Sequence, residues 1–210
     1  MISLEDLEAM YMTCNFDQAW LPKRPSPWCG LFTSESLEVM EYLEDLEYYW
    51  IDGPGHEISW KPACVLIRDV YQNFINVTKG AKEERGIFYF THSGTVLKFL
   101  AYLGTHNDTQ HLRYDNFEQM KDRRWRTSKI SPFAANISFL LQKCDIGHVV
   151  CLYVNEKLET LPGCGEGPGC CDWQTFVSLY KEKIEACDFN SLCSNDDYSG
   201  ENSEVPDDRF

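Results

Sequence analysis

The residue best placed to do chemistry is His92, in the turn Thr91-His92-Ser93-Gly94. The turn follows a continuously apolar run at residues 87–90 and precedes a helical pattern that ends at Gly104. In open α/β sheets, ligands bind beyond the carboxyl ends of parallel strands, where turns lead into helices whose N-termini favour anions. A histidine there can donate a hydrogen bond to a phosphate oxygen and, when protonated, stabilise an oxyanion. The alternative is a histidine that caps the helix or packs at the sheet edge.

A second candidate site is the densest positive charge of the chain. It comprises Lys121, Arg123, Arg124, Arg126 and Lys129, interleaved with Trp125. Such a cluster can attract a polyanionic ligand. A solvated loop whose charges offset nearby acids explains the same pattern, and the residues alone favour this simpler interpretation.

The chain has ten cysteines in 210 residues, which indicates an oxidising compartment. Three sequons, at Asn76, Asn107 and Asn136, are glycosylation candidates and agree with that compartment. Against it, residues 1–8 are acidic and amphipathic, whereas a signal peptide begins with basic residues and an apolar run. We therefore expect the chain to be the downstream part of a longer protein. A cytosolic protein with free buried thiols is the alternative.

Five cysteines gather toward the C-terminal end of the chain, around and after a glycine-rich loop. Cys164, Cys170 and Cys171 border the loop, and Cys187 and Cys193 follow it. Their spacing lacks two CxxC pairs and no histidine stands nearby, so the pattern predicts disulfides and no metal site. We expect Cys164 to pair with Cys170 or Cys171, and Cys187 or Cys193 to join a further bridge.

Three helices are predicted in the opening third of the chain. Apolar residues at helical spacing mark a short helix that begins near Leu4 and ends before the proline-rich residues 21–27. Thr33 or Ser34 can cap a second helix, which residues 52–55 terminate. Its expected apolar positions are Val39, Met40, Leu43, Leu46 and Trp50. A third helix covers residues 64–79, with Gly80 after its last turn.

The pattern changes in the second half of the chain. Residues 87–90 predict a strand buried on both faces, and residues 96–103 predict a helix. Residues 149–154 predict another strand, which Asn155-Glu156 can turn back into residues 157–161 as a hairpin. A last helix begins near Asp172, a competent N-cap.

Composition limits the possible functions. The chain has 33 acidic and 19 basic residues, a formal net charge of −14 and a pI near 4.7, which argues against nucleic acid as the main partner. With 43% hydrophobic residues it can form a core, and no stretch approaches the roughly 20 apolar residues of a membrane helix.

Residues 87–97 resemble the multiple inositol polyphosphate phosphatase family, within the histidine phosphatase superfamily. The other similar stretches are residues 26–29, 39–50, 59–74, 125–128, 132–136 and 152–161. They follow one another in the family's order and cover nearly everything up to residue 193.

The resemblance implies part of an α/β sandwich with helical cap segments and a two-step reaction through a phosphohistidine. The family's nucleophile lies in an Arg-His-Gly-x-Arg-x-Pro motif on the first strand, and no Arg-His-Gly occurs in these residues. His92 corresponds to the second family histidine, which holds the phosphoryl group. The family's proton donor is a glutamate two residues later or, in other branches, the next residue as an aspartate. Here those positions are Gly94 and Ser93, and neither can serve as a carboxylic acid.

The implied function is hydrolysis of phosphomonoesters without a cofactor. Substrates would be inositol hexakisphosphate, lower inositol phosphates and 2,3-bisphosphoglycerate, with Arg123, Arg124 and Arg126 as weaker candidates for guiding them. The chain alone should be incomplete, and without the first strand residues 87–90 and 149–154 should be exposed. The rival interpretation is a non-catalytic, secreted, disulfide-bonded binding protein derived from the family.

The expected organisation has three parts and leaves the oligomeric state open. Residues 1–82 form a mainly helical segment, residues 83–193 the C-terminal part of the α/β domain, and residues 194–210 an acidic disordered tail. The resemblance and the cysteines place the full-length parent in the secretory pathway, although this chain shows no signal peptide.

Overall fold

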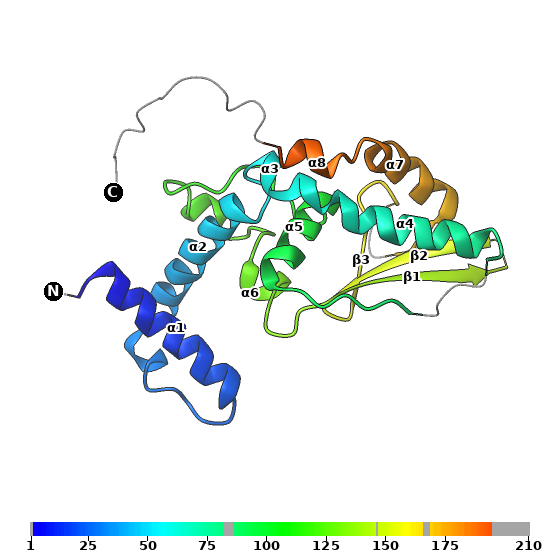
Figure 1. Ribbon diagram of the computed structural model, residues 1–210. Coiled ribbons are helices and arrows are strands. Elements are labelled where there is room, and N and C mark those ends of the chain that lie inside the picture. Colours follow the sequence, from blue (N-terminus) through cyan, green and yellow to red (C-terminus); the bar gives the residue numbers. More distant parts are fainter. Residues whose placement is uncertain (1, 82–85, 146, 166–168, 195–210) are drawn as a thin grey trace, which may run out of the picture.

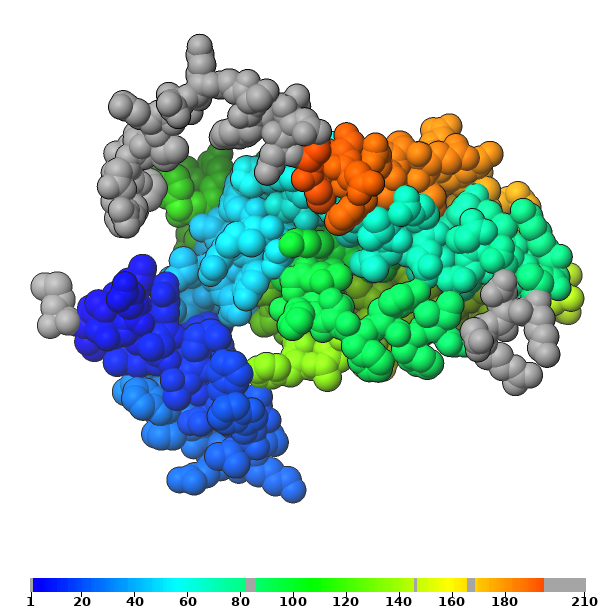
Figure 2. Space-filling model, viewed as in Figure 1, coloured from blue at the N-terminus to red at the C-terminus, as the bar shows by residue number. Residues whose placement is uncertain are grey.

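The computed structural model describes residues 2–81, 86–145, 147–165 and 169–194 of the chain. Helices dominate the first half (Figure 1). The elements are α1 (Leu4–Trp20), η1 (Cys29–Leu31), α2 (Ser34–Ile51), α3 (Glu57–Trp60), η2 (Lys61–Ala63), α4 (Cys64–Thr78) and α5 (Ser93–Leu103). In Figure 2, α1 and the loop after it form a lobe that projects from the body of the molecule.

A small antiparallel sheet and further helices complete the fold. The elements are η3 (Glu118–Met120), α6 (Thr127–Ile130), β1 (Ile137–Cys144), β2 (Gly147–Val154), β3 (Lys157–Glu159), β4 (Cys171–Asp172), α7 (Trp173–Glu185) and α8 (Phe189–Leu192). β2 is central and pairs antiparallel with β1, β3 and β4. Helices α4 and α7 cover one face of the sheet (Figure 1). The mixed α/β architecture is therefore confirmed, although every strand pairing between described residues is antiparallel.

Local signals place most helix ends where the sequence predicts them. The Thr33 hydroxyl accepts a hydrogen bond from the Ser36 amide at 3.2 Å and begins α2. The Asp172 carboxylate does the same for the Thr175 amide at 3.0 Å and begins α7. α5 ends at Gly104, whose φ of 74° lies in the left-handed region that favours glycine.

The predicted hairpin is confirmed. Asn155 and Glu156, with φ of 49° and 61°, form the two-residue turn between β2 and β3. Positive φ at both turn residues gives the twist that matches antiparallel strands. The long pairing of β1 with β2, from Ile137 opposite Val154 to Cys144 opposite Gly147, was not predicted.

The strand predicted at residues 87–90 is wrong. This segment pairs with no strand of the described residues, and its side chains are 47–95% exposed. It runs as an extended line between the end of α4 and α5 (Figure 1). The Tyr89 hydroxyl, which donates to the Asp69 carboxylate on α4, ties it to the body. A continuous apolar run indicates a capacity for burial, but burial needs long-range neighbours that the pattern does not show.

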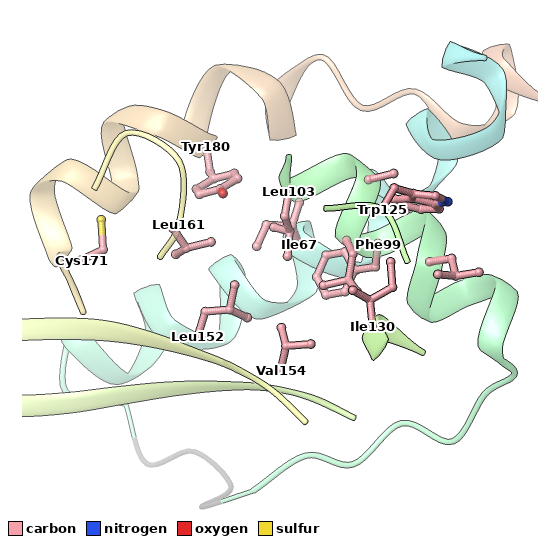
Figure 3. Close-up of a cluster of buried hydrophobic side chains, with 14 of the residues drawn as sticks. Ile67, Phe99, Leu103, Trp125, Ile130, Leu152, Val154, Leu161, Cys171 and Tyr180 are labelled. Atoms are coloured by element: carbon pink, nitrogen blue, oxygen red, sulfur yellow. The ribbon is translucent and has the colours of Figure 1, made fainter. Parts of the chain in front are cut away.

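Of the two expected exposures, that of residues 87–90 is confirmed and that of residues 149–154 is wrong. Residues 149–154 form most of β2, and Val150, Leu152 and Val154 are buried. They face a core that joins α4, α5, α7 and the residues around Trp125. Figure 3 shows Ile67 and Tyr180 on the helices above these strand residues. One core therefore connects the helical first part with the sheet.

The five predicted cysteines behave largely as expected. Disulfides join Cys164 to Cys171 and Cys64 to Cys187, so both expected bridges are present. Two more join Cys151 to Cys170 and Cys14 to Cys29. Cys193, a disulfide candidate, is instead free and exposed, as is Cys144.

Two expectations fall at least partly outside the described residues. The boundary proposed between residues 82 and 83 lies within residues 82–85, which the structure does not describe. The tail lies outside the described residues from residue 195 onward. No helix in the described part of the chain is long and apolar enough to cross a bilayer.

The exposed segment 86–90 makes self-association the expected behaviour of this chain. Phe88 and Phe90 are 81% and 95% exposed, and unpaired apolar segments recruit other chains. Replacing both residues with serine should raise the monomer fraction in size-exclusion chromatography with light scattering. Tyr114→Ser, at a residue 89% exposed outside the segment, is the control. A wild-type chain that stays monomeric at every concentration would contradict the prediction.

The bridge between Cys64 and Cys187 should dominate the stability of the fold. It closes a loop of 123 residues, and a bridge of that span restricts the unfolded chain by about 4–5 kcal/mol. Replacing both cysteines with serine should lower the free energy of unfolding in urea by about that amount. Cys144→Ser, which removes a free thiol, should change nothing. Similar losses of unfolding free energy in the double variant and in Cys144→Ser would contradict this role of the bridge.

Candidate functional site

His92 lies at the N-terminus of α5 with its imidazole exposed to solvent. The residue is the N-cap by position, and its carbonyl accepts hydrogen bonds from the amides of Thr95 and Val96 at 3.0 and 3.4 Å. Its side chain makes no capping hydrogen bond. The imidazole is therefore free to meet a ligand at a helix terminus whose amides favour anions.

An ion pair lies against the first turn of the same helix. The Lys98 ammonium on α5 is 3.0 Å from Oδ1 of Asp52, the residue that ends α2. The Asp52 side chain is 13% exposed, so the pair is partly shielded from water. The end of α2 thus meets the N-terminal half of α5, the helix that follows His92. In the sequence, Asp52 is only the first of the residues 52–55 that terminate a helix, and no motif marks it as a site residue.

Asp45, near the middle of α2, is fully buried and binds the loop that carries the arginines. Its Oδ2 accepts hydrogen bonds from Nε of Arg123 at 2.7 Å and from Nη2 of the same guanidinium. Its Oδ1 accepts from the Thr127 amide at 2.6 Å and the Thr127 hydroxyl at 2.7 Å. Burial raises the pKa of the Asp45 carboxyl, against the opposing effect of the Thr127 and Arg123 donors.

Glu41, one helical turn before Asp45, extends this network. It accepts hydrogen bonds from the Arg126 guanidinium and the Ser128 hydroxyl, and lies 3.4 Å from Nη2 of Arg123. Partial burial acts to raise the pKa of Glu41, but the bonds from Arg126 and Ser128 outweigh it and lower that pKa. Glu41 is therefore held as a carboxylate between two guanidinium groups.

The three arginines proposed to guide a ligand are engaged by the chain itself. The Arg123 side chain is 2% exposed, so in this structure it cannot touch a ligand and serves the core instead. The Arg124 guanidinium donates to the Thr105 carbonyl at 2.7 Å. Arg126 remains 23% exposed and lines a small depression that Glu38 and Asp122 also line. A guiding role for Arg124 and Arg126 remains a prediction.

The three sequons differ in how free their amides are. Asn107 is exposed in the loop after α5. Asn76 lies within α4 and accepts a hydrogen bond from Gln72 at 3.0 Å. The Asn136 amide donates to Glu156 at 2.6 Å. Asn107 is thus the most accessible glycosylation candidate.

Metal ligands do not gather at this site. Within the described ranges, no group of three or more His, Cys, Asp or Glu residues could hold a metal ion. The chemistry available around His92 is therefore that of an imidazole, a helix N-terminus and the Asp52–Lys98 pair.

Comparison with known proteins agrees with these features. The histidine phosphatase superfamily (branch 2) matches residues 1–157. Multiple inositol polyphosphate phosphatase 1 of Drosophila melanogaster is 34% identical over 184 residues, which are 86% of this chain and 38% of that protein. The protein of the same name from Gallus gallus is 28% identical, over 89% of this chain and 43% of its own length. The chain thus spans about two fifths of these relatives.

A solved structure shows the same fold. The phytase from D. castellii superposes with a TM-score of 0.77 over 92% of this chain and 41% of the phytase, at 19% identity. At that identity the likeness concerns the fold alone.

Removing the buried Asp45 carboxylate should lower the free energy of unfolding of the chain. Asp45→Asn leaves the buried Arg123 guanidinium with only Glu41, 3.4 Å from its Nη2, as a counter-charge, and losing one partner of a buried pair typically costs about 3–5 kcal/mol. Urea unfolding followed by circular dichroism measures it. In the control, Asp115→Asn, the acid is 47% exposed and pairs with Arg113, so the change should stay below about 1 kcal/mol. Equal effects would show that the network contributes no more than a surface pair.

Proposed function

Because the chain belongs to branch 2 of the histidine phosphatase superfamily, we propose that it supplies the His92 side of a phosphomonoesterase site. The substrates are inositol polyphosphates, with inositol hexakisphosphate as the first candidate and 2,3-bisphosphoglycerate as a further one. The observation that carries the proposal is the free imidazole of His92 at the N-terminus of α5. Helix amides and an imidazolium together bind a phosphoryl group and stabilise the charge that develops on its oxygens.

The relatives support the choice of substrate. Two of them are named multiple inositol polyphosphate phosphatase 1, and they align with 86% and 89% of this chain. Activity of the whole relative does not transfer to two fifths of its length. The Arg-His-Gly-x-Arg-x-Pro nucleophile motif is absent from the 210 residues. We therefore propose that these residues bind the substrate but do not turn it over alone.

The positive charge near the site has an indirect role in this proposal. The Arg124 guanidinium, bonded to the neutral Thr105 carbonyl, adds positive potential without a direct ligand contact, whereas Glu41 offsets the charge of Arg126. Long-range attraction of that kind raises the rate at which a polyanion arrives.

A secretory compartment fits the covalent structure. Four disulfides use eight of the ten cysteines, and such bridges persist in oxidising compartments. We propose the lumen of the secretory pathway as the place of action of the parent protein.

Calorimetry with inositol hexakisphosphate tests the function on the full 210-residue chain. His92→Ala should weaken binding about tenfold or more, because it removes a charge-assisted hydrogen bond to phosphate. His56→Ala, which removes an exposed histidine packed against Trp50, is the matched control and should leave the affinity unchanged. A phosphate-release assay run in parallel should show no turnover.

Two results would contradict the proposal. Equal affinity of the wild type and His92→Ala for inositol hexakisphosphate would show that His92 does not bind it, and would favour a non-catalytic binding protein. The absence of the nucleophile motif from the 210 residues agrees with that alternative. Turnover that His92→Ala abolishes would show that His92 is itself the nucleophile.

A further inference from the structure

A side chain at Gly94, the second residue of α5, would meet the Asp52 carboxylate. A Cβ built on it would lie 2.6 Å from Oδ2 of Asp52 and 3.2 Å from its Cγ. The Asp52 carboxylate thus fills the space where a side chain of residue 94 would begin. Position 94 is two residues after His92, where the resemblance expects a glutamate that donates a proton.

The backbone after α2 holds Asp52 at this place. The Asp52 amide donates to the Tyr48 carbonyl at 2.9 Å and closes the last turn of α2. The next residue, Gly53, packs so tightly that a Cβ there would lie 2.6 Å from the Trp125 ring and 2.8 Å from the Tyr49 carbonyl oxygen. Gly53 thus lies directly against Trp125, and the Asp52 carboxylate before it lies at the first turn of α5.

We propose that Asp52 supplies the carboxyl group of the His92 site and acts as the proton donor to the leaving oxygen. The inference rests on the proposed function, since it concerns the same phosphoryl group. The acid would therefore come from the end of α2, whereas the resemblance expects it on α5, at position 94. Glycine at position 94 follows from this arrangement, because any side chain there would displace the Asp52 carboxylate.

The chemical step balances as follows. The phosphoryl group passes to a nucleophile, an imidazole nitrogen or water, and the bond between phosphorus and the ester oxygen breaks. The electron pair of that bond stays on the ester oxygen, which takes the proton from the Asp52 carboxylic acid. Asp52 is left as a carboxylate opposite the Lys98 ammonium, and a proton from solvent restores the acid.

A dianion bound beside Asp52 would act on the charge of its carboxyl group. Two negative charges in one site favour the neutral form of the carboxyl group. Lys98 and a protonated His92, both on α5, oppose this effect, and the Tyr48 phenol on α2 also faces Asp52. Anion binding should therefore be coupled to proton uptake at Asp52. A carboxylate that only ends α2 would show no such coupling.

Sulfate is a suitable probe, because it remains a dianion between pH 5 and 8 and takes up no proton itself. Calorimetry of the full chain at pH 6, in two buffers of different ionisation enthalpy, gives the affinity and the number of protons bound. Asp52→Asn should bind sulfate about tenfold more tightly and take up several tenths of a proton less than wild type. Asp115→Asn, which neutralises an exposed acid elsewhere, should match the wild type.

A second variant guards against a folding defect in the first. Gly94→Ala keeps the carboxylate but pushes it out of its place, so proton uptake should fall there as well. Circular dichroism confirms that each variant is folded.

The outcomes separate this inference from the proposed function. If wild type and Asp52→Asn bind sulfate equally with equal proton uptake, while His92→Ala loses binding, Asp52 is only a helix terminator and the His92 site stands. If neither wild type nor Asp52→Asn binds sulfate, the His92 site itself is refuted, and the role of Asp52 with it.

Discussion

The burial of one carboxylate, that of Asp45, determines how the two halves of this protein meet. Two donors of Arg123 and two of Thr127 satisfy its oxygens where no water reaches them. Burying an ion pair rarely adds net stability over an apolar pair, because both charges lose their hydration. What it adds here is position, since only one alignment of α2 on the loop at residues 123–127 satisfies all four bonds.

The position of the candidate site follows from that alignment. With α2 fixed at Asp45, its last turn reaches Trp125, and Gly53 packs closely on this ring. Asp52 is then brought to the first turn of α5, where it pairs with Lys98. His92 lies at the same turn with its ring free. A buried network about two helical turns from Asp52 thus prepares the surroundings of the imidazole.

Local signals in the sequence predict the helices and the hairpin well, because each depends on neighbours along the chain. The Thr33 and Asp172 caps and the turn at Asn155 and Glu156 are of this kind. Residues 87–90 do not form the predicted buried strand, because burial of a strand depends on partners distant in the sequence. β1 was missed because its outer half, with Gln142 and Lys143, carries polar residues that break the apolar pattern.

The candidate site was predictable only in part. His92 could be found from the strand-like run and the helix that flank it. The buried face of α2 was predicted in part: Met40 is buried and Leu46 and Trp50 pack against the core, but Val39 is 51% exposed. The buried residues are Met40, Tyr42, Asp45 and Tyr49. Tyr42, Asp45 and Tyr49 recur at helical spacing, but an acid within an apolar stripe shows its partner, Arg123, only after folding. The same holds for Arg123, which resembles part of a ligand site in sequence and serves the core in the structure.

The bridge between Cys64 and Cys187 has a mechanical consequence. It encloses α4, α5, the sheet and α7 in one covalent ring, whereas α1 and α2 lie outside it. The hydrogen bonds and ion pairs of Asp45 and Glu41 cross from the outer part to the ring, and they carry no covalent reinforcement. Tension between the chain ends would therefore peel the first 63 residues from the ring by breaking these contacts. The ring itself would extend no further while its disulfide stays intact, so the protein would yield in two mechanically distinct parts.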